Sequence, residues 1–76
     1  MSWNYRVLIH RDPRGDCYMI HKVFYKKNGK IDAWSKDGMH PLGETMAELK
    51  SDTRLMRRAF NRPVLEIKGK KLIEAM

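Results

Sequence analysis

The sequence has little cysteine and no long apolar run. Cys17 is the single cysteine among 76 residues, so no disulfide can form within the chain. No segment approaches the ~18 apolar residues of a membrane-spanning helix, and the N-terminus lacks the basic start and apolar stretch of a secretory signal. We therefore expect a soluble, cytoplasmic protein without membrane association, whose fold depends on its hydrophobic core or on a partner chain.

Acidic residues are also scarce. Nine Asp and Glu stand against sixteen Lys and Arg, which gives a formal net charge of +7. A positive domain attracts polyanions through long-range, salt-dependent forces, so nucleic acid or an acidic protein is the expected partner. The same charge also keeps a small protein in solution, and both interpretations stay open.

Motifs for catalysis, metal binding or phosphate binding are not recognisable. A chain of this length buries too little surface to shape a deep enzyme cleft. His10 and Cys17 can approach across a hairpin, but His21 lies roughly 13 Å beyond Cys17 at ~3.3 Å per residue, too far to share one ion. His40 is placed in a loop. We predict a protein that is not an enzyme and has no metal or cofactor.

Three strands are predicted in the first half of the chain. Side chains alternate between apolar and polar over residues 3–9, the period of a half-buried strand. A turn over residues 12–16 leads into a second strand over residues 17–26. Asn28-Gly29 is typical of a type I′ hairpin turn, because both residues tolerate positive φ, and it predicts a third strand over residues 30–35.

A helix is predicted from about Met46 to Phe60. Thr45 and Glu48 match a capping box, in which the Thr oxygen accepts from the amide three residues on and the Glu carboxylate reaches back to the Thr amide. Pro63 ends the helix. An apolar face about 80° wide is predicted on this helix. It consists of Met46, Leu49, Thr53, Met56 and Phe60.

The last part of the chain is short of clear signals. Residues 64–68 predict a fourth strand, short enough to be an edge of the sheet. Residues 69–76 carry no firm assignment, and we expect a flexible tail or a frayed turn of helix.

The order β-β-β-α-β predicts a single α+β domain over residues 1–76, with a three- to four-stranded, mainly antiparallel sheet and one helix on one face. The expected core is Val7, Ile9, Ile20, Phe24, Leu49, Met56, Phe60, Leu65 and Ile67. The other face of the sheet would then be exposed to solvent or covered by a partner. We therefore also predict that the protein can form a homodimer. The aromatic residues predicted to line that face are Trp3, Tyr5, Tyr25 and Trp34.

The predicted helix has a basic side next to its apolar face. Lys50, Arg54, Arg57 and Arg58 lie within about 100° on the helical wheel, and Arg62 continues the same side. Such a stripe can follow a phosphate backbone while Tyr and Trp stack on bases. The alternative is that the outer side of a helix is normally charged and this one is basic.

Two segments resemble a known family. YRVLIHRDPRGDCYMIHKVF is similar to the opening hairpin of the HicB-like antitoxin domain, a small partial ribonuclease H-like fold, and GETMAELKSDTRLMRRAF is similar to the beginning of its helix. The resemblance covers about residues 3–68. It implies a non-enzymatic regulatory module that binds a protein partner, such as a small messenger-RNA-cleaving toxin. Two alternatives remain, namely a nucleic-acid-binding protein that uses the basic side of the helix and a mobile-element inhibitor of a nucleic-acid enzyme.

Overall fold

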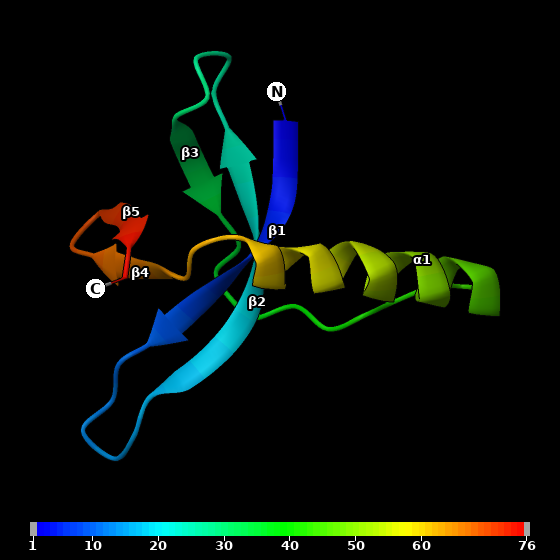
Figure 1. Ribbon diagram of the computed structural model, residues 1–76, viewed down its shortest axis with the longest axis horizontal. Helices are drawn as coiled ribbons and strands as arrows, with labels where there is room; N and C mark the ends of the chain where they lie inside the picture. The colour runs from blue at the N-terminus through cyan, green and yellow to red at the C-terminus, as the bar shows by residue number, and fades with distance from the viewer. Residues whose placement is uncertain (1, 76) are drawn as a thin grey trace.

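The computed structural model describes residues 2–75, and it has one helix and a five-stranded sheet (Figure 1). The elements are β1 (Ser2–His10), β2 (Cys17–Tyr25), β3 (Ile31–Trp34), α1 (Met46–Arg57), the 3-10 turn η1 (Arg58–Asn61), β4 (Leu65–Lys68) and β5 (Lys71–Glu74). The α+β class with a single helix is confirmed. The predicted strand number and order are matched only roughly, because β5 follows β4 and the sheet order is β3-β2-β1-β4-β5.

The sheet is mixed rather than purely antiparallel. β1 and β2 form a long antiparallel hairpin, paired from Ser2 and Tyr25 to His10 and Cys17. β3 is antiparallel to β2, and β4 is parallel to β1. The connection from β3 through α1 to β4 is therefore a crossover between parallel strands, which requires a long segment such as a helix. β4 lies between β1 and β5, so the prediction that it forms an edge is wrong.

β5 lies where we expected a flexible tail or a frayed helical turn, and that expectation is wrong for residues 71–74. Lys68 pairs with Lys71, which leaves a two-residue turn in which Gly69 has a φ of +62°. In β5 only Leu72 is buried. A four-residue segment with one buried side chain has too little alternation to indicate a strand from the sequence. Gly69 allows the tight turn through which β5 pairs with β4. Met76 lies outside the described residues.

The Asn28-Gly29 turn is at the predicted place but of a different type. Only Gly29 has positive φ, at +86°, and its amide donates to the Lys26 carbonyl oxygen at 2.9 Å. The amide of Lys26 donates to the Lys30 carbonyl oxygen at 2.8 Å. This is the three-residue hairpin loop with one left-handed glycine, not a type I′ turn.

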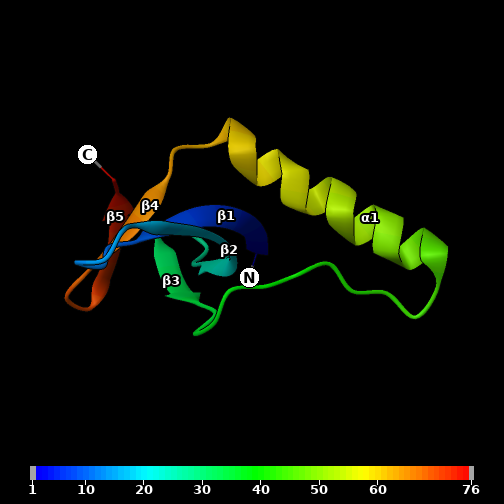
Figure 2. The same cartoon turned by 90° about the horizontal axis from the view of Figure 1, so that it is seen from below.

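Each face of the sheet has its own core. On the side of α1, the cluster of buried residues is Tyr5, Val7, Met56 and Ala59. On the opposite side, the cluster is Leu8, Val23, Leu65 and Leu72, with Tyr25, Ile31 and Trp34 packed against it. The sheet curls over this second cluster, so that residues of β5 and β3 join it (Figure 2). We predicted that the face away from α1 is exposed to solvent or covered by a partner. This is wrong, because the curl of the sheet covers that face.

The predicted core is partly correct. Val7, Ile9, Met56 and Leu65 are buried, and Ile20, Phe24 and Leu49 are half-buried. Phe60 and Ile67 are 68% and 41% exposed, so both assignments are wrong. Phe60 turns outward because the chain tightens after Arg57 into η1, whose three residues per turn break the 3.6-residue period used for the prediction. Ile67 lies one residue before the end of β4, close to the β4–β5 turn and beyond the part of the strand that joins the second core cluster at Leu65.

The helix begins as predicted but uses its cap differently. The Thr45 hydroxyl accepts from the Glu48 amide at 3.1 Å, whereas the Glu48 carboxylate accepts from the amide of Glu44 at 2.8 Å rather than from that of Thr45. The first turns of α1 extend beyond the sheet (Figures 1 and 2). Met46 is consequently 69% exposed. Of the apolar face that we predicted, Met56 is buried and Leu49 is half-buried, whereas the other three residues are exposed.

α1 is rotated about its axis relative to the prediction, by about 60° on the helical wheel. Its inward side consists of Leu49, Asp52, Met56 and Ala59. Asp52 accounts for the rotation, because the Tyr5 hydroxyl donates to one carboxylate oxygen at 2.7 Å and the Leu42 amide donates to the other at 2.9 Å. Asp52 therefore joins the sheet, the helix and the loop before the helix.

The Tyr5–Asp52 hydrogen bond also shifts the pKa of both groups. Burial, the hydrogen bond and the negative charge of Asp52 raise the pKa of Tyr5 to about 12. The hydrogen bonds from Tyr5 and from the Leu42 amide lower the pKa of Asp52. The carboxylate is therefore the form that the fold stabilises.

Replacing Tyr5 by Phe removes this bond and leaves the ring in place. We expect the free energy of unfolding to fall by about 1 kcal/mol, and the melting temperature by roughly 4–8 °C. The loss should be present above about pH 4, the ordinary pKa of an unfolded Asp, and should shrink as the pH falls through the lower pKa of folded Asp52. Thermal unfolding followed by circular dichroism measures both effects.

Tyr18→Phe is the matched control for this variant, because the Tyr18 side chain is 62% exposed. It should change the free energy of unfolding by less than about 0.5 kcal/mol. Equal melting temperatures for the two variants would show that the Tyr5–Asp52 bond does not stabilise the fold.

Candidate nucleic-acid interface

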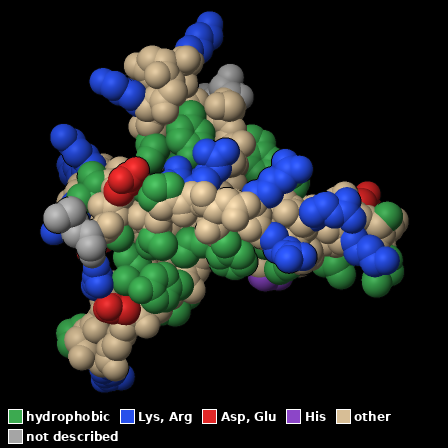
Figure 3. Space-filling model, viewed as in Figure 1, with side chains coloured by type: hydrophobic (Ala, Val, Ile, Leu, Met, Phe, Trp, Pro, Cys, Tyr) green, Lys and Arg blue, Asp and Glu red, His purple; other side chains and the backbone are tan. Residues whose placement is uncertain are grey.

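The five basic residues predicted from the sequence lie together on the outward side of the helix. They are Lys50, Arg54 and Arg57 of α1, Arg58 of η1 and Arg62, which follows η1, and we call them the basic face. All five side chains are exposed. Figure 3 looks onto this side of α1 and shows Lys and Arg side chains along its length. The basic face is turned away from the side that packs on β1.

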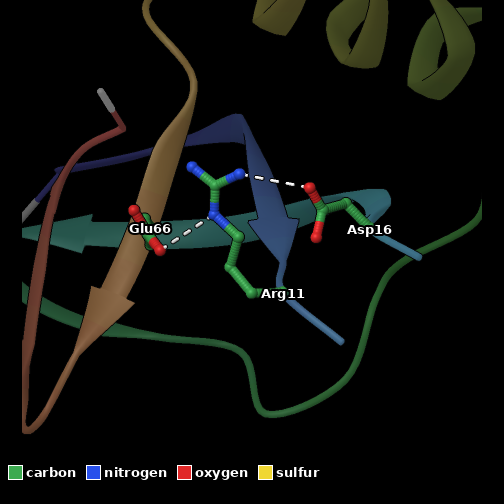
Figure 4. A network of polar contacts seen from close by, with 3 residues as sticks. All are labelled: Arg11, Asp16 and Glu66. Carbon is green, nitrogen blue, oxygen red and sulfur yellow. Dashed lines mark hydrogen bonds and ion pairs between the residues drawn. The ribbon is translucent and has the colours of Figure 1, made fainter. Parts of the chain in front are cut away.

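Acidic partners do not neutralise the basic face. The two ion pairs among residues 2–75 both use Arg11, which contacts Asp16 and Glu66 at 3.1 Å each (Figure 4). The acids of α1 accept backbone or Tyr5 hydrogen bonds. Within the described chain, the five cations therefore carry uncompensated charge.

The spacing along the helix places like charges next to one another. Lys50, Arg54 and Arg58 follow at intervals of four residues, which is ~6 Å along the axis of a helix. Like charges at this spacing destabilise a helix by about 0.2–0.5 kcal/mol per pair. A surface of interspersed charges is sufficient for solubility and avoids this repulsion. An anionic ligand would relieve it.

Arg6 holds the end of the basic face in place. Its side chain is only 8% exposed, and the guanidinium donates to the Pro63 carbonyl oxygen at 2.8 Å and to the Tyr25 hydroxyl at 3.1 Å. Because Pro63 follows Arg62 directly, the bond to the Pro63 carbonyl oxygen ties the segment of Arg62 to β1. The sequence predicts this position only as part of an alternating strand, since nothing local marks a buried arginine.

The four aromatic residues predicted to line one face lie on two. Tyr5 is in the cluster on the helix side, and Trp3 lies beside it, whereas Tyr25 and Trp34 pack against the second core cluster. The register explains this, because Trp3 pairs with Phe24 and so places Tyr25 on the opposite face. Tyr5 is buried, and Trp3 is 45% exposed. The four side chains therefore do not form one surface.

Trp3 instead borders a groove between β1 and the basic face. The groove has a volume of about 220 Å³, and its lining residues are Trp3, Asn4, Tyr5, Leu55, Arg58 and Arg62. Leu55, which is 42% exposed, lies on neither the predicted apolar face nor the basic face, and we did not single it out. Only the packing of the helix on β1 brings it opposite Trp3.

A second cluster of polar side chains lies on the other face of the sheet. The Nε2 atoms of His10 and His21 are 2.9 Å apart, and Nδ1 of His21 is 2.9 Å from the Ser35 carbonyl oxygen. If Nδ1 donates to that carbonyl, Nε2 of neutral His21 accepts from His10. Among residues 2–75, no three His, Cys, Asp or Glu side chains gather as ligands for a metal ion. The exposed Cys17 pairs with His10 across the hairpin.

Burial lowers the pKa of His21, and the hydrogen bond to Ser35 opposes that shift. A histidine with a lowered pKa contributes stability that is present above its unfolded pKa of ~6.5 and is lost as the pH falls through the folded pKa. We therefore expect the protein to lose stability as the pH falls below about 6.5. In His21→Gln this loss should be smaller, although the variant is less stable at pH 7.

Urea unfolding at several pH values measures this dependence, with the exposed His40 replaced by Gln as the control. His40→Gln should retain the pH dependence of the unmodified protein. A His21→Gln variant that loses stability over the same pH range by the same amount would contradict the assignment.

Among the described residues, no helix combines the length and the apolar character required to cross a membrane. No protein-family model, curated protein or solved structure matches this chain. The resemblance to HicB-like antitoxin domains therefore stays a prediction, as do the toxin partner and the homodimer.

Proposed function

We propose that the protein is a non-catalytic module that binds nucleic acid, and that its basic face holds the phosphate backbone. The observation that carries this proposal is the alignment of five exposed, unpaired cations on one side of α1 and η1. Long-range attraction of a polyanion by a domain of net charge +7 supports the same conclusion.

Arginine suits this role better than lysine does. A guanidinium group donates several N–H bonds in a fixed fork, and this fork matches two oxygens of one phosphate. Four of the five cations of the basic face are arginines. Contacts of this kind position the backbone and carry no sequence information. We therefore expect binding with little sequence preference.

The rigidity of the helix contributes to the interface. Met56 and Ala59 are buried against β1, and Tyr5 and Arg6 hold the helix and the following segment to the same strand. The basic groups therefore project from an ordered backbone, which lowers the entropy lost on binding.

The proposal predicts a steep dependence of affinity on salt. If all five cations contact phosphates of a single strand, the slope of log K against log salt is about −3.5, from five contacts at about −0.7 each. The affinity should then fall about a hundredfold between 50 and 200 mM salt. In the double variant Arg54→Gln, Arg58→Gln, three contacts remain and the slope should be about −2. Fluorescence anisotropy of a labelled 20-nucleotide strand measures these slopes.

The control is Lys27→Gln with Lys30→Gln, which removes the same charge from the exposed loop between β2 and β3. Its salt slope should equal that of the unmodified protein. If both double variants weaken binding equally, net charge rather than the basic face drives association, and the proposal is wrong. Absence of binding at 50 mM salt would also refute it.

A further inference from the structure

We infer that the groove beside the basic face accepts an unpaired base, so that the ligand is single-stranded nucleic acid with one base stacked on Trp3. This inference rests on the proposed function and specifies the class of nucleic acid. It depends on the chemistry of the groove, in which the exposed indole of Trp3 lies near Arg58 and Arg62.

The indole of Trp3 is held in position before any ligand binds. Its ring meets the Tyr5 ring edge-on, with centroids 5.3 Å apart and planes at 85°. Tyr5 is in turn fixed by its hydrogen bond to Asp52. The Lys22 ammonium lies 4.3 Å from the centroid of the Trp3 ring and occupies one face of it. Trp3 nevertheless keeps 45% of its surface exposed and lines the groove, so part of the indole is left for a second flat group. Little side-chain entropy is lost when that group binds.

The groove combines this aromatic surface with positive charge. Arg58 and Arg62 belong to both the groove and the basic face, whereas no carboxylate lines the groove. Leu55 offers apolar contact across from the indole. A nucleotide is complementary to this groove. Its base is flat and partly apolar, like the surface of Trp3 and Leu55, and its phosphate is anionic, opposite in charge to the two arginines. A base on Trp3 would thus leave its phosphate beside Arg58 or Arg62.

The size of the groove limits what it can hold. Sites for whole small molecules usually have volumes of about 300–1,000 Å³. At about 220 Å³ the groove is smaller than these. It suits one flat group of a longer ligand whose remaining parts bind elsewhere, and the basic face provides the site for the attached backbone.

A single strand fits these features better than a duplex. In a duplex each base is paired and stacked, so its face is not available to an aromatic side chain. In a single strand the bases can turn outward and stack on aromatic rings, which contributes affinity without sequence preference. A duplex held by its phosphates alone would leave Trp3 unused.

The test compares a 12-nucleotide oligothymidylate, an oligouridylate of the same length and a 12-base-pair DNA duplex at 50 mM salt. Trp3→Ala should weaken binding of the single strands by about 5- to 150-fold and leave binding of the duplex unchanged. Trp3→Phe should retain most of the affinity. Tyr18→Ala is the matched control, because Tyr18 is an exposed aromatic outside the groove, and it should bind as the unmodified protein does.

A second measurement avoids the risk that Trp3→Ala disturbs the fold. In Trp34→Phe, Trp3 is the remaining tryptophan. Its fluorescence should fall when either single strand is added and should not change with the duplex. A response to one strand alone would identify RNA or DNA as the ligand.

The outcomes separate this inference from the function on which it rests. If Arg54→Gln with Arg58→Gln weakens binding while Trp3→Ala and Tyr18→Ala bind alike and Trp3 fluorescence is constant, phosphate binding stands and base stacking is refuted. Equal affinity for duplex and single strand would overturn the preference for single strands. If no nucleic acid binds at 50 mM salt, both proposals fall.

Discussion

The packing of the helix on the first strand is the contact on which the rest of the structure depends. Met56 and Ala59 meet Tyr5 and Val7 in one buried cluster. The Tyr5–Asp52 hydrogen bond fixes the rotation of the helix about its axis. This rotation turns the basic face outward and brings Arg58 beside Trp3. A small domain buries little surface, so a few contacts of this kind determine its geometry.

The curl of the sheet decides where recognition can take place. The face away from α1 is filled by its own cluster, which includes Leu8, Val23 and Leu72. The Tyr25 and Trp34 side chains therefore contribute to packing. Trp3 is different, because it lies near the N-terminal end of β1 and keeps 45% of its surface exposed. The proposed interface consequently combines this one aromatic residue with the basic face, rather than an aromatic sheet surface.

Several elements could be predicted from local patterns. The β1–β2 hairpin follows from alternation and from the turn around Gly15, and the helix start follows from Thr45. The basic face was also predictable, since Lys50, Arg54 and Arg58 fall on one side of any helix through these residues. β5 and the exposure of Phe60 were not predictable, because one depends on pairing with β4 and the other on the tightening of the chain into η1.

The amino-acid pattern alone was thus enough for the α+β class, the position of the helix and the grouping of its cations, because these depend on residues close together in the chain. The parallel pairing of β1 with β4, the second core and the groove beside Trp3 were decided by tertiary structure. Each of them joins segments far apart in the sequence. For the groove, the physical reason is that the Tyr5–Asp52 hydrogen bond sets the rotation of the helix about its axis. The two residues are 47 positions apart in the sequence, and no local periodicity encodes their contact.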